Sequence, residues 1–431
     1  MTASRNGEAF SLLTGEPVSW NRTKRATMSW YDFACAYVDM KWKAASAKHR
    51  AGIAYALTLA TSAMLTDTCP YSDAEVRTAL RRWAYNTKAR ADCPEETHQI
   101  LAWVARHCEP VSALSTPTLT RALLTSATSR LDGRPAAAST SRNHRVILSN
   151  TMAYAVELKL LDANPIRDLK WKAPRTSPEV DRRSVVNPTQ AHALLDAVRR
   201  QEPSGPLLMP FFALLYFAGL RPEEAVTLHE SDLTLPAQEG TWGYIHLTRA
   251  APLAGKEWTD SGKSRDSRGL KHRAEGETRL VPCVPELVEI LRAHLASSSS
   301  RPDGRVLHGP GGRELSPTTI RRVWDRARRA ALSEAEYSSP LAKRPYDLRH
   351  ACLSTWLNAG VPAKQVAEWA GNSVKVLLST YAKCLVGQDE IAMRRIAEAL
   401  QSEVVQPLGQ ASYPGRATGL ETRSARLQKS R

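Results

Sequence analysis

The stretch Ala-Gly-Leu-Arg-Pro-Glu-Glu-Ala, residues 218–225, is the part of the sequence that most narrows the choice of fold. It places Arg221 at a Gly-Leu corner directly after the apolar segment 207–220. Arginine is rarely buried there unless it is paired, and Glu224, three residues further on, is within reach as a supporting carboxylate. Taken alone, the pattern fits a helix-capping arginine with a local ion pair at least as well as a functional site.

A second segment, Pro-Tyr-Asp-Leu-Arg-His at residues 345–350, predicts the start of a helix that ends at Gly360. Arg349 lies in the first turns of that helix, where backbone amides and the helix dipole favour a phosphate group. Taken alone, an arginine at this position is better explained as a surface residue on the exposed face of an amphipathic helix.

A third segment, Trp-Ala-Gly-Asn-Ser at residues 369–373, predicts a helix end at Gly371 followed by a polar turn. Tyr381 follows Asn372 by nine residues. Most tyrosines are half-buried packing residues, so the alternative for Tyr381 is a structural role.

Composition and charge restrict the class of protein. The 431 residues include 59 Lys+Arg and 43 Asp+Glu, giving a formal net charge of +16 that predicts a polyanionic partner. The longest nearly uncharged apolar run, 207–220, is shorter than the roughly 18 residues of a membrane span. The first twenty residues lack a signal peptide's apolar segment, and the seven cysteines form no Cys-x-x-Cys pair. We therefore expect a cytoplasmic protein with no disulfide framework, zinc site or membrane span.

The order of helical and mixed patterns predicts a mostly α, multidomain chain. The first half reads as helices at 31–65, from 72, and at 95–107, 117–130, 141–160 and 163–169, with a Ser72–Glu75 capping box. A Pro-rich, basic stretch follows, and an Asn187–Gln190 capping box begins the second domain. The expected divisions are a flexible arm, a helical domain, a basic linker, a mixed α+β domain and a flexible basic tail, over residues 1–27, 28–170, 171–186, 187–401 and 402–431.

Within the second domain, two apolar helices flanking Gly205 and two strands at 241–248 and 278–284 predict a small sheet. The polar stretch between the strands, 249–277, carries seven Lys/Arg, and loops of this length in compact domains are usually functional or disordered. A helix from Ser316 has an apolar stripe, and its arginines are expected around the remaining face; they are Arg321, Arg322, Arg326, Arg328 and Arg329.

In this order and spacing the three segments resemble the tyrosine recombinase (phage integrase) family, whose boxes match at GLRPEEA 219–225, YDLRH 346–350, WAGNS 369–373 and TY 380–381. The variant boxes are similar to those of actinobacterial integrases. The resemblance implies an α+β catalytic domain with a small antiparallel sheet, preceded by a helical, SAM-like core-binding domain.

The resemblance also implies a site-specific DNA recombinase that cuts and rejoins duplex DNA through a covalent 3′-phosphotyrosyl intermediate. Arg221 and Arg349 would clamp the phosphate oxygens, and Tyr381 would be the nucleophile. A lysine of the basic hairpin would protonate the leaving 5′ oxygen. Lys271 is the preferred candidate, and Lys256 and Lys263 stay open.

No cofactor is expected. The sequence has no phosphate-binding loop of the G-x-x-x-x-G-K-[ST] type, and a phosphotyrosyl link conserves bond energy without ATP. An arginine clamp also supplies the charge stabilisation that a metal ion would provide, so no metal is expected.

Two positions depart from the family pattern. Tyr346 stands where His or Lys is usual, and Asn372 where His or Trp is usual. Both side chains can donate to a phosphate but neither shuttles protons near neutral pH, so we assign Tyr346, Asn372 and the neighbouring His350 to phosphate positioning. The departures leave open a second hypothesis, a catalytically impaired DNA-binding protein on the same fold.

The expected partner is double-stranded DNA carrying attachment-type sites of a mobile element. The family implies a homo-tetramer on DNA, a monomer or weak oligomer alone, an accessory directionality factor and a nucleoid-associated location. Residues 389–400 suit a helix that packs on a neighbouring copy, or a terminal core helix. Type IB topoisomerase activity and loose, general nucleic-acid binding are the remaining alternatives.

Overall fold

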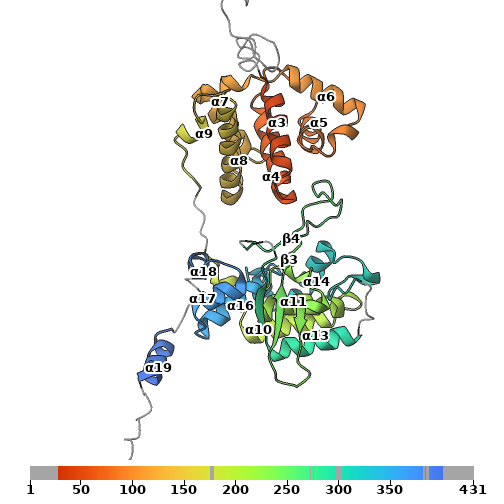
Figure 1. The fold of residues 1–431 in the computed structure, drawn as a ribbon, viewed down its shortest axis with the longest axis vertical. Helices are drawn as coiled ribbons and strands as arrows, with labels where there is room; N and C mark the ends of the chain where they lie inside the picture. Colours follow the sequence, from red (N-terminus) through yellow and green to blue (C-terminus); the bar gives the residue numbers. More distant parts are fainter. Residues whose placement is uncertain are drawn as a thin grey trace, which may run out of the picture. The chain divides into compact units, whose positions relative to one another are not determined.

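A computed structural model of the chain describes residues 28–174, 179–271, 273–274, 276–297, 303–381, 384 and 388–400 (Figure 1). The predicted N-terminal arm and C-terminal tail lie outside the described residues. The chain divides between Val386 and Gly387 into two compact units, and each unit is described by itself. Helix α19, Gln388–Leu400, belongs to the second unit.

The first half of the chain is helical and has its own hydrophobic core, built from residues such as Trp30, Leu57, Leu123 and Leu148. Its helices are α3 Trp30–Trp42, α4 Ala47–Ser62, α5 Asp73–Ala79, α6 Glu95–Arg106, α7 Pro117–Thr128, α8 Ala138–Glu157 and α9 Pro165–Asp168. The predicted Ser72–Glu75 capping box is confirmed at the start of α5, where each residue bonds the other's backbone amide.

One prediction for this half is wrong. The single helix expected over 31–65 is two helices, because the chain leaves the helical conformation before Ser46, whose extended backbone begins α4. The segment between them, Lys-Ala-Ala-Ser, offers no large apolar side chain that would hold a continuous helix on the core. Met40, near the end of α3, is exposed.

The second half combines a small antiparallel sheet with helices (Figure 1). The sheet has the order β1-β2-β5, with β1 Leu233–Thr234, β2 Gly243–Leu247 and β5 Arg279–Cys283. A separate hairpin pairs β3 Arg249–Ala250 with β4 Arg268–Gly269. The helices are α10 Pro188–Arg199, α11 Ser204–Phe217, α12 Pro222–Ala225, α13 Pro285–Ser297, α14 Pro317–Ala331, α15 Glu334–Ser338, α16 Asp347–Asn358, α17 Ala363–Ala370 and α18 Val374–Tyr381. The fold is therefore the predicted helical domain plus an α+β domain.

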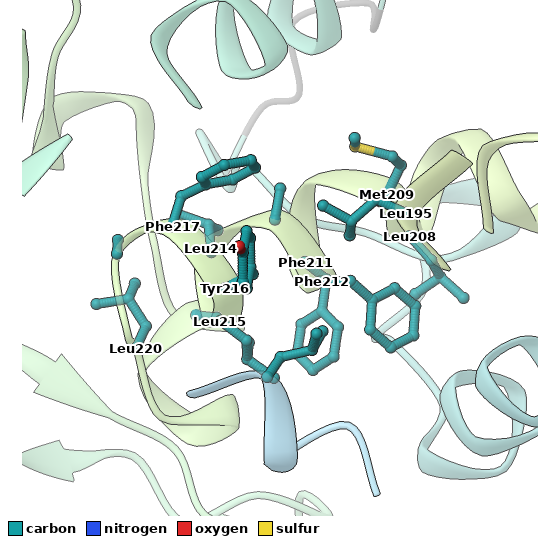
Figure 2. Close-up of a cluster of buried hydrophobic side chains, with 14 of the residues drawn as sticks. Leu195, Leu208, Met209, Phe211, Phe212, Leu214, Leu215, Tyr216, Phe217 and Leu220 are labelled. Carbon is teal, nitrogen blue, oxygen red and sulfur yellow. The ribbon is translucent and has the colours of Figure 1, made fainter. Parts of the chain in front are cut away.

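Helix α11 is the centre of the second core. Its side chains are buried on nearly every face, and Figure 2 shows Phe211, Phe212 and Leu215 directed into the cluster. Phe212 stacks on Trp324 of α14 with ring centroids 5.0 Å apart. This packing fixes the end of α11, and with it the Gly-Leu-Arg corner that follows.

Two finer predictions for this half are wrong. Gly205 lies in the first turn of α11 rather than between two helices. Arg328 is buried, not on the exposed face of α14, because its guanidinium donates to the Leu341 and Tyr337 carbonyls.

The predicted Asn187–Gln190 capping box is confirmed at α10. Among the described residues, no helix has the length and apolar character needed to cross a membrane.

Candidate active site

A buried carboxylate, Glu224, organises the site. Glu224 lies in α12, and Arg221 forms the N-cap of that short helix. The Arg221 Nη1 donates to Glu224 Oε1 over 2.7 Å, and the Arg221 backbone amide donates to Oε2 over 2.9 Å. The predicted local pair between these residues is therefore present, and it fixes the arginine backbone and side chain together.

A second arginine, Arg279, grips the same carboxylate from β5. Its Nη1 and Nη2 donate to the two Glu224 oxygens over 2.9 and 2.7 Å, a bidentate pair that is fully buried. The sequence analysis missed Arg279. Strand alternation could have found it, because Arg279, Val281 and Cys283 share the inward face of the strand.

The charge balance of this site favours an anion. Burial alone would raise the pKa of Glu224, but Arg279, Arg221 and Arg349 together lower it to about 2. The carboxylate thus remains ionised at all working pH values. Three guanidinium groups around one carboxylate, here called the guanidinium cluster, leave a net positive charge that further negative charge can neutralise.

The turn after α17 completes the cluster. Gly371 adopts a left-handed conformation with φ of 63°, and its carbonyl accepts from Arg221 Nη2 over 2.7 Å. The same Nη2 donates to Asn372 Oδ1 over 2.8 Å. A Cβ at position 371 would overlap the Arg279 guanidinium, so glycine is required both for the backbone conformation and for space. Asn372, a predicted phosphate-positioning residue, therefore holds Arg221.

Arg349 is as deeply buried as Arg279. It lies in the first turn of α16 and is only 1% exposed. Its Nη2 donates to the Ala370 carbonyl over 2.7 Å, and its Nη1 donates to the Gly219 carbonyl. The side chain thus joins the Gly-Leu-Arg corner to the end of α17, and the surface-arginine alternative is wrong.

Tyr381 ends α18 and is buried, 2% exposed. Its hydroxyl lies 2.8 Å from His350 Nδ1. Burial lowers the pKa of His350 to about 4, so the imidazole is neutral and can accept the phenol proton's hydrogen bond in its Nε2–H tautomer. Burial also raises the pKa of the Tyr381 phenol, and the nearby Arg349 acts in the opposite direction. Tyr346, at the N-terminus of α16, places its ring edge-on against His350.

Lys271 and Arg221 border one hollow of about 640 Å³, together with Arg273, Asn372 and Val376. Lys271 follows β4 by two residues and is exposed. Neither Arg349 nor Tyr381 is among the described residues that line this hollow. Lys256 borders a different hollow, next to Arg77 and Arg81 of the helical domain, and Lys263 lines neither.

Comparisons with known proteins agree with this architecture. Residues 184–385 match the sequence model of the phage integrase family. The tyrosine recombinase XerC of Pelotomaculum thermopropionicum is 26% identical over 228 residues, which cover 51% of this chain and 62% of that protein. The chain thus matches less than two thirds of that relative's length.

Two solved structures are similar at lower identity. The integrase of transposon Tn1549 in complex with transposon right end DNA has a TM-score of 0.50 at 15% identity, covering 74% of this chain and 99% of that chain. A lambda integrase dimer bound to a COC′ core site has a TM-score of 0.41 at 16% identity, covering 67% and 72%. Only the first supports the fold. These findings show that residues 184–385 are similar to the phage integrase family and that the chain shares the fold of the Tn1549 integrase.

Proposed function

We propose that the protein is a site-specific DNA recombinase that breaks and rejoins duplex DNA through a covalent 3′-phosphotyrosyl intermediate. The observation that carries the proposal is the guanidinium cluster beside a hollow that Arg221 and Lys271 both border. A phosphodiester in this hollow would meet a fixed positive charge and an exposed ammonium group. The family match over residues 184–385 and the DNA complex of the similar Tn1549 integrase support the choice of substrate.

Arg221 is the arginine best placed to touch the phosphate. Its side chain borders the hollow, whereas both Nη atoms of Arg349 are taken by backbone carbonyls. Arg349 contributes its charge beneath the site, and it contacts the phosphate directly only if those carbonyl contacts open. Asn372 keeps Arg221 in one orientation, which preorganises the electrostatic stabilisation of the transition state.

The reaction forms one bond and breaks another. The Tyr381 oxygen attacks phosphorus, its proton passes to an acceptor, and the bond from phosphorus to the 5′ oxygen breaks as that oxygen takes a proton from Lys271. His350, assigned to phosphate positioning from the sequence, instead lies with Nδ1 against the phenol and is the proton acceptor within reach. The second strand end then reverses the step, so bond energy is conserved and neither ATP nor another cofactor takes part.

Because Tyr381 is buried, cleavage requires α18 to bring its phenol out to the bound phosphate. This movement of α18 would take place when four copies of the protein bind DNA. Met393, Ile396 and Leu400 of α19 are exposed, which suits packing of this helix on a neighbouring copy. The protein would act on attachment-type sites, with an accessory directionality factor choosing between integration and excision.

A second candidate function is DNA binding without catalysis. The enclosed tyrosine and the Tyr346 substitution favour it, since no histidine stands at position 346 to donate a proton. It predicts specific, salt-sensitive binding and no covalent product.

The test uses a duplex selected from a random pool for specific binding, with a nick placed to trap the covalent product. Wild-type protein is expected to form an adduct that survives denaturing electrophoresis, and Tyr381→Phe is expected to bind equally well without forming one. Tyr244→Phe, an exposed tyrosine of β2, serves as the matched control and should behave as wild type. An adduct with Tyr381→Phe would refute the nucleophile, and tight binding with no wild-type adduct would establish the second candidate.

A further inference from the structure

The segment between β3 and β4 contacts the helical domain through a buried tryptophan. Trp258, in the middle of this polar stretch, is 2% exposed and belongs to the hydrophobic cluster of the helical domain. Its ring centroid lies 6.2 Å from that of Trp42 in α3. A tryptophan so fully removed from water is expected to anchor its segment strongly, because it buries one of the largest apolar surfaces of any residue.

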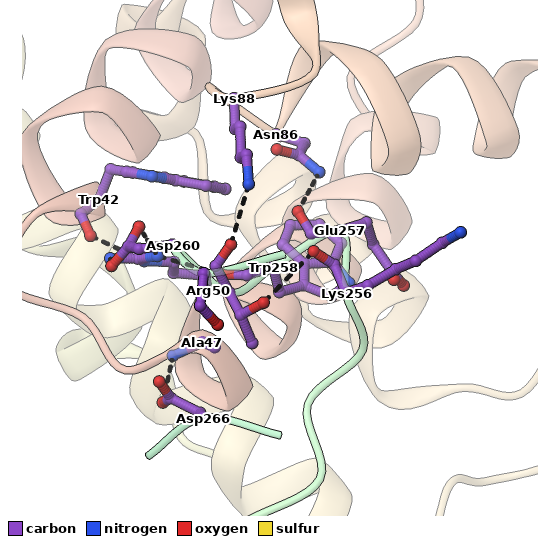
Figure 3. Close-up of polar contacts among 12 residues, drawn as sticks. Trp42, Ala47, Arg50, Asn86, Lys88, Lys256, Glu257, Trp258, Asp260 and Asp266 are labelled. Carbon is purple, nitrogen blue, oxygen red and sulfur yellow. Dashed lines mark hydrogen bonds and ion pairs between the residues drawn. The ribbon is translucent and has the colours of Figure 1, made fainter. Parts of the chain in front are cut away.

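Polar contacts fix the backbone on both sides of this anchor (Figure 3). Three consecutive carbonyls, those of Glu257, Trp258 and Thr259, accept hydrogen bonds from helical-domain side chains. The donors are Asn86 at 3.1 Å, Arg50 at 3.0 Å and Lys88 at 3.2 Å, respectively. Because each carbonyl has its own donor, the segment is held in one register as well as by burial.

An ion pair closes the contact. Arg50 is buried, and its two Nη atoms donate to the Asp260 oxygens over 2.7 and 3.0 Å. The guanidinium also lies 4.7 Å from the centroid of the Trp42 ring. At the other end of the segment, Asp266 accepts from the Ala47 backbone amide over 3.2 Å. Removing Asp260 would leave a buried arginine charge without its carboxylate, which is costly.

The same segment ends next to the candidate general acid. Leu253 and Arg265 form an isolated β-bridge between the two arms of this segment. The arms lead into β3 and β4, which pair with each other, and Lys271 comes two residues after β4. Arg265 also donates to the Ala251 and Leu315 carbonyls, which fixes the base of the segment to the α+β domain. Lys271 itself is exposed, so the arms provide the structure that limits where it lies.

We infer that residues 251–266 form an interdomain latch, anchored by Trp258 and Asp260, that positions Lys271 to protonate the leaving oxygen. Trp258 and Asp260 are positioning residues that act through the hairpin. This inference rests on the proposed function, in which Lys271 is the general acid. When the latch releases, the cluster still binds phosphate but proton delivery slows.

The test varies the leaving group. A 5′-bridging phosphorothiolate expels a thiolate, whose pKa is low enough that it needs no proton, so it restores cleavage only where protonation is the defect. Lys271→Ala should slow adduct formation on the ordinary duplex by about 10²-fold and regain most of that on the sulfur substrate. Asp260→Arg should slow it by roughly 10-fold and recover in the same way, because only the acid is displaced.

Control variants separate the latch from general damage. Arg50→Asp combined with Asp260→Arg restores the ion pair with its charges exchanged and should recover most of the rate. Asp303→Arg removes an exposed Asp–Arg pair elsewhere and should leave the rate unchanged. Trypsin cleavage at Lys256 and Lys263, mapped by mass, should accelerate in Asp260→Arg and slow again in the exchanged pair, and this readout needs no activity.

Equal slowing of Asp260→Arg on both substrates, or no slowing on either, would overturn the latch while wild-type adduct formation leaves the proposed function standing. If Lys271→Ala is not rescued by sulfur, Lys271 is not the acid, and the latch inference fails with it. A wild-type protein that forms no adduct on either substrate would instead show failure of the proposed function. Trp258→Ala should match Asp260→Arg, provided that its melting curve shows a folded protein.

Discussion

The guanidinium cluster and the Lys271 hairpin border the same hollow but are built in opposite ways. Arg279, Arg349 and Glu224 are each about 1% exposed and fixed by buried hydrogen bonds within one domain. Lys271 is exposed, and its hairpin is held at a distance by contacts with another domain. The difference teaches that phosphate binding is preorganised in this chain, while proton donation depends on domain docking. Four substitutions test the part of the site that is fixed by buried contacts.

The largest effect is expected from Arg279→Met, which leaves Glu224 buried with one guanidinium fewer. Breaking a buried ion pair by removing one partner should lower the free energy of unfolding by about 3–5 kcal/mol. Urea unfolding followed by circular dichroism measures it. Arg292→Met, an exposed arginine of α13, is the control and should change stability by less than about 0.5 kcal/mol. Equal urea midpoints for the two variants would show that the buried Arg279–Glu224 pair contributes little to stability.

Arg221→Ala should come next and should act on catalysis. Loss of one preorganised donor to the transition state should slow adduct formation on the order of 10²- to 10³-fold. Arg221→Lys keeps the charge without the planar fork and should recover only part of the loss. Arg273→Ala borders the same hollow but pairs with Glu277, so it should slow the reaction far less. Comparable rates for the Arg221 and Arg273 variants would remove Arg221 from the site.

Gly371→Ala tests how tightly the turn fits against Arg279. Left-handed backbone strain alone should cost about 1 kcal/mol, and the overlap with the guanidinium should bring the loss to about 2–3 kcal/mol. Gly133→Ala has φ of 77° and open space around it, so it measures the strain alone. Thermal melting of both variants gives the difference. Identical losses would mean that Arg279 moves aside freely.

The smallest effect concerns pH. The pKa of His350 is lowered from 6.5 to about 4 in the folded protein, so between these values only the unfolded chain binds the proton. Its contribution to stability is complete above pH 6.5 and is lost as the pH falls toward 4. His350→Gln should flatten this part of the stability profile by about 1–2 kcal/mol.

His192→Gln is the matched control for that measurement. Backbone and Glu286 contacts raise the pKa of His192, so its contribution is present at low pH and lost as the pH rises through the folded pKa. The two variants should therefore change the slope of stability against pH in opposite directions. The same direction for both would contradict the buried, neutral state of His350.

Local signals in the sequence predicted much of the fold. The capping boxes at Ser72 and Asn187 and the strand alternation around Ile245 depend on neighbouring residues, which any window of sequence contains. The three boxes also indicated candidate site residues, and the structure brings four of them together, Arg221, Glu224, Arg349 and Asn372.

The rest depends on contacts between distant residues, which a local pattern does not contain. Arg279 meets Glu224 across 55 residues, and Arg50 meets Asp260 across 210. A lone tryptophan in a polar stretch predicts a loop, and only the helical domain's core shows where Trp258 packs. The break before Ser46 was missed because the apolar period continues on both sides of it.

The central claim is that the phenol of Tyr381 attacks the phosphate held beside Arg221. Trypsin cleavage after Lys375 and Lys383 releases a peptide, 376–383, in which Tyr381 is the sole tyrosine. Nuclease and trypsin digestion of the wild-type adduct, followed by mass spectrometry, should find the nucleotide remnant on this peptide. A remnant on the peptide that contains Tyr346, or on any other, would contradict the account.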